Sequence, residues 1–187
     1  GYFASKYASG EGTKESPYII ETPEQLAKLM LDPATAGKYY KLGADIRLND
    51  TSSENWTKTA RQWFGGTSEF AGNFDGNGHV VSGLYFNTEF AYAGLFPQIT
   101  SGAVIRRVGI TRSSVTVSGE ESYAGALVGR IVGWNFKEED FVTPVISQCF
   151  ADHTVKISCY NAGGLVGGCG MKVDIDNCYF TGRLYVD

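Results

Sequence analysis

The sequence has little of what nucleic-acid binding, membrane insertion or metal coordination requires. Its formal net charge is −4, and the nearest approach to a basic cluster is the isolated pair Arg106-Arg107. Neither nucleic acid nor an anionic membrane surface is therefore an expected partner. No apolar run approaches the roughly 20 residues that a membrane-spanning helix needs. The four cysteines lack C-x-x-C spacing and have no accompanying histidine pattern, so neither a metal site nor a cofactor is expected.

Proline is also scarce, with five residues against 24 glycines, and the chain starts without the basic and apolar segments of a secretory leader. The glycines indicate tight turns rather than disorder, because eleven phenylalanines, eleven tyrosines and three tryptophans supply ample apolar area. A chain of 187 residues is long enough for one domain with a sizeable core. The missing leader leaves open whether the protein is cytosolic or already processed.

The chain is organised around a glycine-rich repeat. The segment Ala-Gly-Gly-Leu-Val-Gly at 162–167 recurs as Ala-Gly-Ala-Leu-Val-Gly at 124–129 and, degraded, as Ala-Gly-Leu-Phe-Pro at 93–97. Each copy is followed by a strand-like run with the same apolar spacing, at 104–110, 145–151 and 174–180. Repeats of this length predict stacked supersecondary units.

The spacing within the repeats locates one insertion. The leucine of the glycine-rich segment and an inward residue of the next run are 13 residues apart in the first and third repeats but 22 apart in the second. The middle repeat therefore carries 22 − 13 = 9 additional residues, near 134–142. A fainter copy precedes the three repeats, and we align its Val81 and Phe86 with Ile105 and Ile110 of the first.

A third, alternating segment completes each repeat, at 115–117, 155–157 and 184–186. Three short strands per rung predict an all-β fold, a right-handed parallel β-helix with inward side chains stacked in columns. We expect a single domain over 1–187, with an N-terminal loop at 1–16 and rungs over 38–187. Cys149 and Cys178 fall in one column, about 4.8 Å apart on adjacent rungs, either as buried thiols or as a disulfide.

One helix is predicted, over residues 22–31. Thr22 is the N-cap, Pro23 takes the first helical position and Gln25 completes a capping box. An apolar stripe follows at helical spacing, and Asp32-Pro33 ends it. Because an open first rung would expose unpaired backbone groups and apolar side chains, we interpret this helix as the N-terminal cap of the stack.

Eight residues are predicted to serve turn or repeat geometry. Asp75, Gly76, Asn77 and Gly78 lie between two apolar runs, where a turn with positive φ is required. Calcium binding by this turn is the alternative, but the nonapeptide calcium repeat is absent. The remaining four are glycines of the repeat, and no Lys-Ser/Thr or helix follows them as in a phosphate-binding loop: Gly94, Gly125, Gly163 and Gly167.

The order of the segments at 17–26, 40–46 and 70–79, followed by the glycine-rich copies, resembles the GLUG-motif β-helix modules of bacterial secreted and cell-surface proteins. The match covers most of residues 10–187. The resemblance implies a right-handed β-helix in a large, adhesin-like protein, and it implies no catalytic residues. Pro97, in place of a closing glycine, and the nine-residue insertion depart from the pattern.

Four residues invite a catalytic interpretation. Asp174 and Asp176 share one strand face, and paired carboxylates are what glycoside hydrolysis needs. The equivalent positions of the preceding rungs hold valine, serine and arginine, so we favour a solvated strand face. The two histidines, His79 and His153, have no serine or cysteine partner that the sequence identifies, which argues against nucleophilic catalysis.

The insertion supplies the candidate binding residues Trp134, Phe136, Phe141 and Glu138. Insertions in solenoids project from one face and often bind, and aromatic rings beside acids suit a sugar ring and its hydroxyls. The alternative is that the aromatic rings fold back over the coil as a satellite core.

The sequence thus favours a noncatalytic, secreted or cell-surface module that acts as a scaffold or binds a polysaccharide or a host or cell-surface protein. The alternative is a carbohydrate-active enzyme, a polysaccharide lyase or glycoside hydrolase, since such enzymes also use β-helices and fold alone does not decide function. The strand at 184–187 has no visible cap after it, so we expect a fragment of a longer chain or end-to-end self-association through the last rung.

Overall fold

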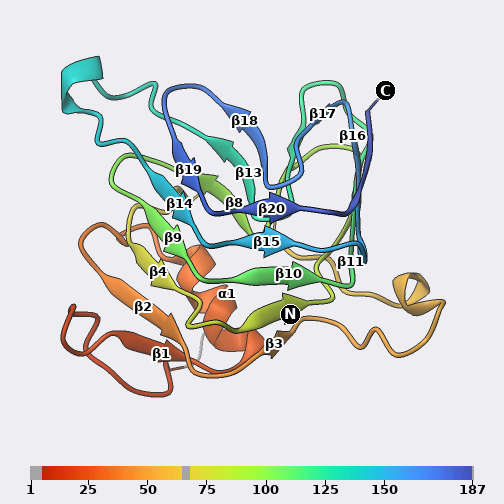
Figure 1. Cartoon of the computed structure of the whole chain (residues 1–187), viewed down its shortest axis with the longest axis horizontal. Helices are drawn as coiled ribbons and strands as arrows, with labels where there is room; N and C mark the ends of the chain where they lie inside the picture. Colours follow the sequence, from red (N-terminus) through yellow and green to blue (C-terminus); the bar gives the residue numbers. More distant parts are fainter. Residues whose placement is uncertain (1–5, 65–67, 187) are drawn as a thin grey trace.

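A computed structural model describes residues 6–64 and 68–186, and nearly all of its regular structure is short parallel strands (Figure 1). Residues 1–5 of the predicted N-terminal loop and residue 187 of the predicted last strand lie outside the described residues. Every pairing between named strands is parallel. None of the described residues belongs to a helix that is long and apolar enough to cross a membrane.

The strands form five sheets, which we name A to E in the order in which the chain reaches them. Sheet A holds β1 (Tyr18–Ile20), β2 (Tyr39–Leu42), β4 (Asn73–Asp75), β9 (Val104–Arg106), β14 (Val145–Ser147) and β19 (Asp174–Asp176). Sheet B holds β3 (Ile46–Arg47), β5 (Val80–Ser82), β10 (Gly109–Thr111), β15 (Phe150–Ala151) and β20 (Tyr179–Phe180). Sheet C holds β6 (Tyr85–Thr88), β11 (Ser113–Val117), β16 (Val155–Cys159) and β21 (Arg183–Tyr185). Sheet D holds β7 (Tyr92–Ala93), β12 (Tyr123–Ala124) and β17 (Asn161–Ala162), and sheet E holds β8 (Phe96–Ile99), β13 (Val128–Ile131) and β18 (Val166–Cys169).

The chain visits the five sheets in one fixed order. It runs through A, B, C, D and E as β4 to β8, again as β9 to β13 and again as β14 to β18, before β19 to β21 return to A, B and C. We call one such visit a coil. Each strand pairs with its equivalents in the coils before and after it, an arrangement consistent with a parallel β-helix.

Each coil contains five short strands rather than the three predicted. The run at 104–110 divides into β9 and β10 because Arg107 between them has a φ of 56°, in the left-handed region. Asn77, Gln148 and Asn177 hold the same turn in the other coils, with φ of 54°, 56° and 50°. Arginine and glutamine rarely adopt this conformation, so the sequence gives no signal of the break. The second additional strand is the two-residue strand of sheet D before each glycine-rich segment.

This turn also corrects the predicted alignment of the first coil. Val81 pairs with Ile110, not with Ile105, and the partner of Ile105 in the preceding coil is Phe74. Phe86 likewise pairs with Val115. The mistake arose because Phe74 and Val81 are 81 − 74 = 7 residues apart, whereas their partners Ile105 and Ile110 are 110 − 105 = 5 apart, so the spacing of the later coils does not apply to the first.

The interior is filled by columns of apolar side chains, one from each coil. In sheet A the column runs through Tyr40, Phe74, Ile105 and Ile146, each at most 1% exposed. Its last member, Ile175, is 47% exposed because no further strand of the described residues pairs with β19 on that side.

Helix α1 (Pro23–Leu31) lies at the N-terminal end of the stack (Figure 1). The Thr22 hydroxyl accepts a hydrogen bond from the Gln25 amide at 3.2 Å, and the Gln25 side chain accepts one from the Glu21 amide at 2.7 Å. The first bond satisfies a backbone donor that a helix start leaves free, whereas the second goes to the residue before the N-cap and not to Thr22, as the predicted capping box would require. The buried face of α1 enters the core through Leu26, Ala27, Leu29 and Met30.

The connection from β13 to β14 is longer than its equivalents. Residues 132–144 connect these strands, whereas residues 100–103 and 170–173 suffice in the neighbouring coils. The long connection contains the 3-10 turn η2 (Glu138–Asp140) and projects from the stack at the upper left of Figure 1.

All four cysteines are free thiols, so the disulfide alternative is not realised in the structure. The Cys149 amide donates a hydrogen bond to the Cys178 sulfur at 3.4 Å, which places the two residues in one column. Burial raises the pKa of the Cys149 thiol to about 12.

Candidate functional site: a basic groove on sheet A

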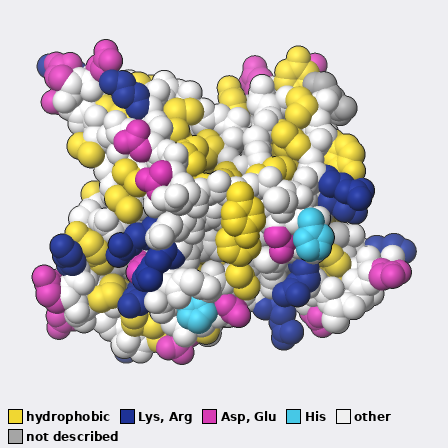
Figure 2. All heavy atoms as spheres, viewed as in Figure 1, with side chains coloured by type: hydrophobic (Ala, Val, Ile, Leu, Met, Phe, Trp, Pro, Cys, Tyr) yellow, Lys and Arg dark blue, Asp and Glu magenta, His cyan; other side chains and the backbone are white. Residues whose placement is uncertain are grey.

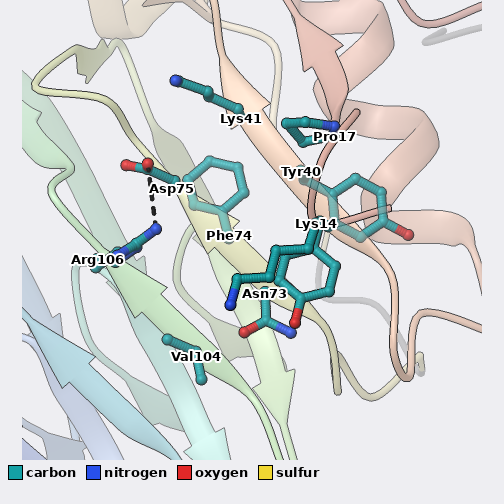
Figure 3. Close-up of a pocket in the computed structure, with 10 residues that line it drawn as sticks. Lys14, Pro17, Tyr40, Lys41, Asn73, Phe74, Asp75, Val104 and Arg106 are labelled. Carbon is teal, nitrogen blue, oxygen red and sulfur yellow. Dashed lines mark ion pairs between the residues drawn. The ribbon is translucent and has the colours of Figure 1, made fainter. Parts of the chain in front are cut away.

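A groove of about 400 Å³ crosses the outer face of sheet A where β2, β4 and β9 lie side by side (Figure 3). The alternation of a strand creates it: in β2, Tyr40 and Leu42 are buried in the core, so Tyr39 and Lys41 face outward. Its lining combines polar and apolar surface from these strands and from the segment before β1: Lys14, Pro17, Tyr39, Tyr40, Lys41, Asn73, Phe74, Asp75, Val104 and Arg106.

The strand register arranges the outward side chains in two rows. Lys41, Asp75 and Arg106 are paired across β2, β4 and β9 and form a charged row. Tyr39, Asn73 and Val104 form the second row in the same way. The site is therefore assembled from three segments that are far apart in the sequence.

Asp75, in the middle of the charged row, is held by Arg107. The Arg107 Nε and Nη2 donate to its two carboxylate oxygens at 2.9 and 2.6 Å, and the Asn77 amide donates to it at 2.8 Å. Burial by itself would raise the pKa of Asp75, but the hydrogen bonds from Arg107 and the Asn77 amide and the charges of Arg107 and Arg106 outweigh it and lower the pKa. Asp75 is therefore ionised and already neutralised by Arg107.

The remaining charges of the groove are cations. Among the described residues, no carboxylate forms an ion pair with Lys14 or Lys41. Arg106 approaches Asp75 only to 3.6 Å, and its side chain is 56% exposed. Figure 3 shows Arg106 directed at Asp75 and Lys14 reaching beside Asn73. Figure 2 shows dark-blue side chains gathered on the left, where Figure 1 places β2, β4 and β9.

The insertion places its four predicted binding residues in different environments. Trp134 is 82% exposed, whereas Phe141 is 8% exposed and belongs to the core cluster. The Phe136 ring packs edge-on against Phe141, with centroids 5.8 Å apart. Glu138 forms an ion pair with Lys172 at 3.3 Å. Phe141 is therefore a packing residue, and Trp134 is the most exposed aromatic side chain of the set.

Trp134 borders a second groove, of about 290 Å³, on the outer face of sheet E. Arg130, which also lines this groove, stacks over the Tyr92 ring at 3.6 Å and donates to the Gln98 side chain at 2.9 and 2.8 Å. Tyr123, on β12 of sheet D, pairs with Tyr92 and lines the groove as well. This groove offers aromatic surface, but its arginine is already engaged.

The predicted acidic pair lies elsewhere, on the last strand of sheet A. Asp174 and Asp176 are exposed and pair with Val145 and Ser147 of the preceding coil, whose hydroxyl donates to Asp176. No group of three metal-ligating side chains occurs within residues 6–64 and 68–186.

The two histidines are distant in sequence and lie in different environments. His79 contacts the Asp45 carboxylate at 3.1 Å, and His153 is exposed. The Val80 amide and, after it, His79 lower the pKa of Asp45 through hydrogen bonds.

The predicted turn glycines lie where backbones approach closely. A Cβ on Gly76 would be 2.4 Å from the Arg107 carbonyl oxygen, and one on Gly125 would be 2.6 Å from that of Leu165 in the next coil. Gly78 has a φ of 79°. At Gly94, Gly163 and Gly167 a Cβ would likewise come within 2.7 Å of backbone atoms.

Sequence reasoning did not identify the groove on sheet A. Each of its strands contributes only one or two outward side chains, and their meeting depends on the register between coils. The alternation of Tyr39-Tyr40-Lys41-Leu42 was the available signal, but it identifies an outward face and not its neighbours.

The fold and this site define a class: a protein of parallel sheets, traversed coil by coil, with a basic groove on one outer face. No family model matches the chain. It is 33% identical over 134 residues to a protein of Evansella cellulosilytica named "Putative Gly-rich membrane protein", a match that covers 70% of this chain and 15% of that protein. It is 32% identical over 108 residues to halomucin of Haloquadratum walsbyi, covering 57% of this chain and 1% of that protein.

A solved structure shares the fold. The crystal structure of a "putative immunoglobulin A1 protease from Bacteroides ovatus" superimposes with a TM-score of 0.69 at 22% identity. The superposition covers 94% of this chain and 50% of that chain. At this identity the likeness concerns the fold. The chain thus corresponds to a part of proteins that are considerably longer.

Proposed function

We propose that the chain is a noncatalytic module of a secreted or cell-surface protein, wound as a right-handed parallel β-helix, that binds a ligand on its outer faces. The fixed order of the five sheets supports the β-helix. The right hand is the one that nearly all crossovers between parallel strands adopt. The position of α1 at the first coil supports its role as a cap, since its apolar face covers core side chains there.

The relatives support the location at the cell surface. One is named a membrane protein and the other halomucin, and both are much longer than this chain. The location and the module's place in a longer protein are transferred from them as parts of this proposal.

The groove on sheet A is the observation that carries the binding role. It combines two lysines without carboxylate partners among the described residues, and an arginine that shares its carboxylate with Arg107, with an aromatic side chain and an amide on a sheet face. Such a surface suits recognition of a glycan or of a host or cell-surface protein, which is the adhesin-like role. The positions paired with the acidic residues of β19 in the two preceding coils hold valine, serine and arginine, so no stacked acidic cluster forms there, which weighs against the metal site of a polysaccharide lyase.

A screen of immobilised polysaccharides and cell-surface glycoproteins tests the proposal, with bound protein and released oligosaccharide measured in the same wells. We expect binding without release. Trp134→Ala tests whether the groove on sheet E takes part. Release of oligosaccharide that is lost in an Asp174→Ala/Asp176→Ala variant would replace the proposal with a glycan-cleaving enzyme, and binding to none of the probes would refute it.

A further inference from the structure

The charged row of the groove has two cations and one carboxylate: Lys41 has no carboxylate partner among the described residues, and Arg106 approaches only Asp75, at 3.6 Å. Arg107 takes both oxygens of Asp75 in a bidentate pair, which uses the one acidic side chain among the described residues that line the groove. Lys41 and Arg106 therefore flank a neutralised pair, and Lys14 adds a third positive charge from the N-terminal loop. A local surplus of cations on a chain of net charge −4 indicates an anionic ligand.

The spacing of these cations indicates a ligand with repeated charge. Lys41 and Arg106 occupy the same register position on β2 and β9, with β4 between them. Their backbones are thus two strand spacings apart, roughly 10 Å. One strand spacing is close to the length of a pyranose unit in an extended polysaccharide, so cations on alternate strands match anionic groups on alternate sugars.

The second row suits the rest of a sugar ring. Tyr39 and Val104 offer apolar surface to the C–H face of a pyranose, and the Asn73 amide between them can both donate to and accept from hydroxyls. An extended peptide would instead pair its backbone with a sheet edge, whereas the groove lies on a sheet face that presents side chains only.

We propose that the groove on sheet A binds an acidic polysaccharide, with uronate carboxylates or sulfate groups on Lys14, Lys41 and Arg106 and a sugar ring over Tyr39. This inference rests on the proposed binding function and specifies its site and ligand class.

The test compares short oligogalacturonates with the same oligomers after carboxyl reduction, which removes the charge and keeps the sugar. Calorimetric titration of the wild-type chain is expected to detect binding of the acidic oligomer at least about tenfold tighter than that of the reduced one, because charge-assisted hydrogen bonds are lost. A sulfated glucan distinguishes sulfate from carboxylate recognition. Poly-L-glutamate tests the acidic protein alternative.

The groove variant is Lys41→Gln/Arg106→Gln, which leaves the bidentate pair of Arg107 and Asp75 intact. Its matched control is Lys156→Gln/Arg183→Gln, two exposed, paired cations of sheet C that give the same net charge. We expect the groove variant to lose at least about tenfold in affinity for the acidic oligomer and the control to lose less than about twofold. Both should unfold at the wild-type urea concentration, because the four side chains lie outside the core.

Three outcomes would overturn the inference. Equal affinity for acidic and reduced oligomers would leave the binding function standing but remove the acidic ligand. Equal losses in the two variants would assign the effect to net charge, and binding of poly-L-glutamate in preference to every acidic glycan would assign the groove to a protein ligand.

Discussion

Substitution of Gly125 by alanine tests how closely successive coils stack, because it adds one methyl group between them. A Cβ there would lie 2.5 Å from the Val128 carbonyl oxygen, 2.6 Å from the Leu165 carbonyl oxygen and 2.8 Å from the Gly167 nitrogen. All three are backbone atoms, and two of them belong to the next coil. Gly125→Ala therefore cannot be accommodated by turning a side chain and must displace one coil from the next.

The loss in free energy of unfolding has two sources, overpacking and strained backbone hydrogen bonds. Overpacking of an interior costs about 1–3 kcal/mol. The Leu127 and Val128 amides, which both donate to Leu165, would be strained as well, at about 1 kcal/mol for each bond lost. Alanine also reduces the conformational entropy of the unfolded chain, which stabilises the variant by about 0.4–1 kcal/mol and offsets part of the loss. We expect Gly125→Ala to lower the free energy of unfolding by about 2–4 kcal/mol.

Equilibrium unfolding in urea, followed by far-ultraviolet circular dichroism, measures this difference. Gly170→Ala is the matched control, because its Cβ would meet one backbone atom at 3.4 Å, an ordinary contact. The control should stay within about 1 kcal/mol of the wild type. If the two alanine variants unfold at the same urea concentration, the close approach of the coils at Gly125 is not real.

Three further predictions follow from the packing and the charges. Asp75→Asn should lower the free energy of unfolding by about 1–2 kcal/mol at neutral pH, because the ion pair with Arg107 is lost. The pKa of Asp75 is lowered in the folded state, so this stability is present above the unfolded pKa of about 3.9 and is lost as the pH falls through the folded pKa. Urea unfolding of the variant and the wild type should therefore converge in acid. Ile105→Ala should cost about 2–5 kcal/mol, and Ile175→Ala, in the same column but 47% exposed, clearly less; equal unfolding midpoints would contradict the column. Burial and its raised pKa should leave Cys149 unmodified by iodoacetamide at pH 8 while exposed Cys169 reacts, and mass spectrometry that finds equal labelling would show that Cys149 is accessible.

Repetition made the parallel stacking predictable from sequence. Equivalent residues of successive coils carry the same apolar spacing, so the pairing of Ile146 with Ile105 on one side and Ile175 on the other follows from aligning the copies. The start of helix α1 was equally predictable, because Thr22, Pro23 and Gln25 are local signals that depend on nothing outside the helix start.

The site was less predictable because it depends on relations between coils. Nothing local to Lys41 or Arg106 indicates that the two share a row, and the partner of Asp75, Arg107, lies at a left-handed turn of the next coil that the sequence does not signal. The aromatic residues of the insertion look alike in sequence, yet Phe141 is buried and Trp134 exposed, since their packing is decided by how the loop lies on the coil.

The most direct test of the account is the change in backbone amide chemical shifts when an oligogalacturonate is added to the isotope-labelled chain. The account predicts that the affected amides fall in three segments distant in sequence, at 39–41, 73–75 and 104–106, which only the register of sheet A brings together. Shifts confined to the insertion at 134–142 or to the last coil would contradict it and place the binding surface elsewhere.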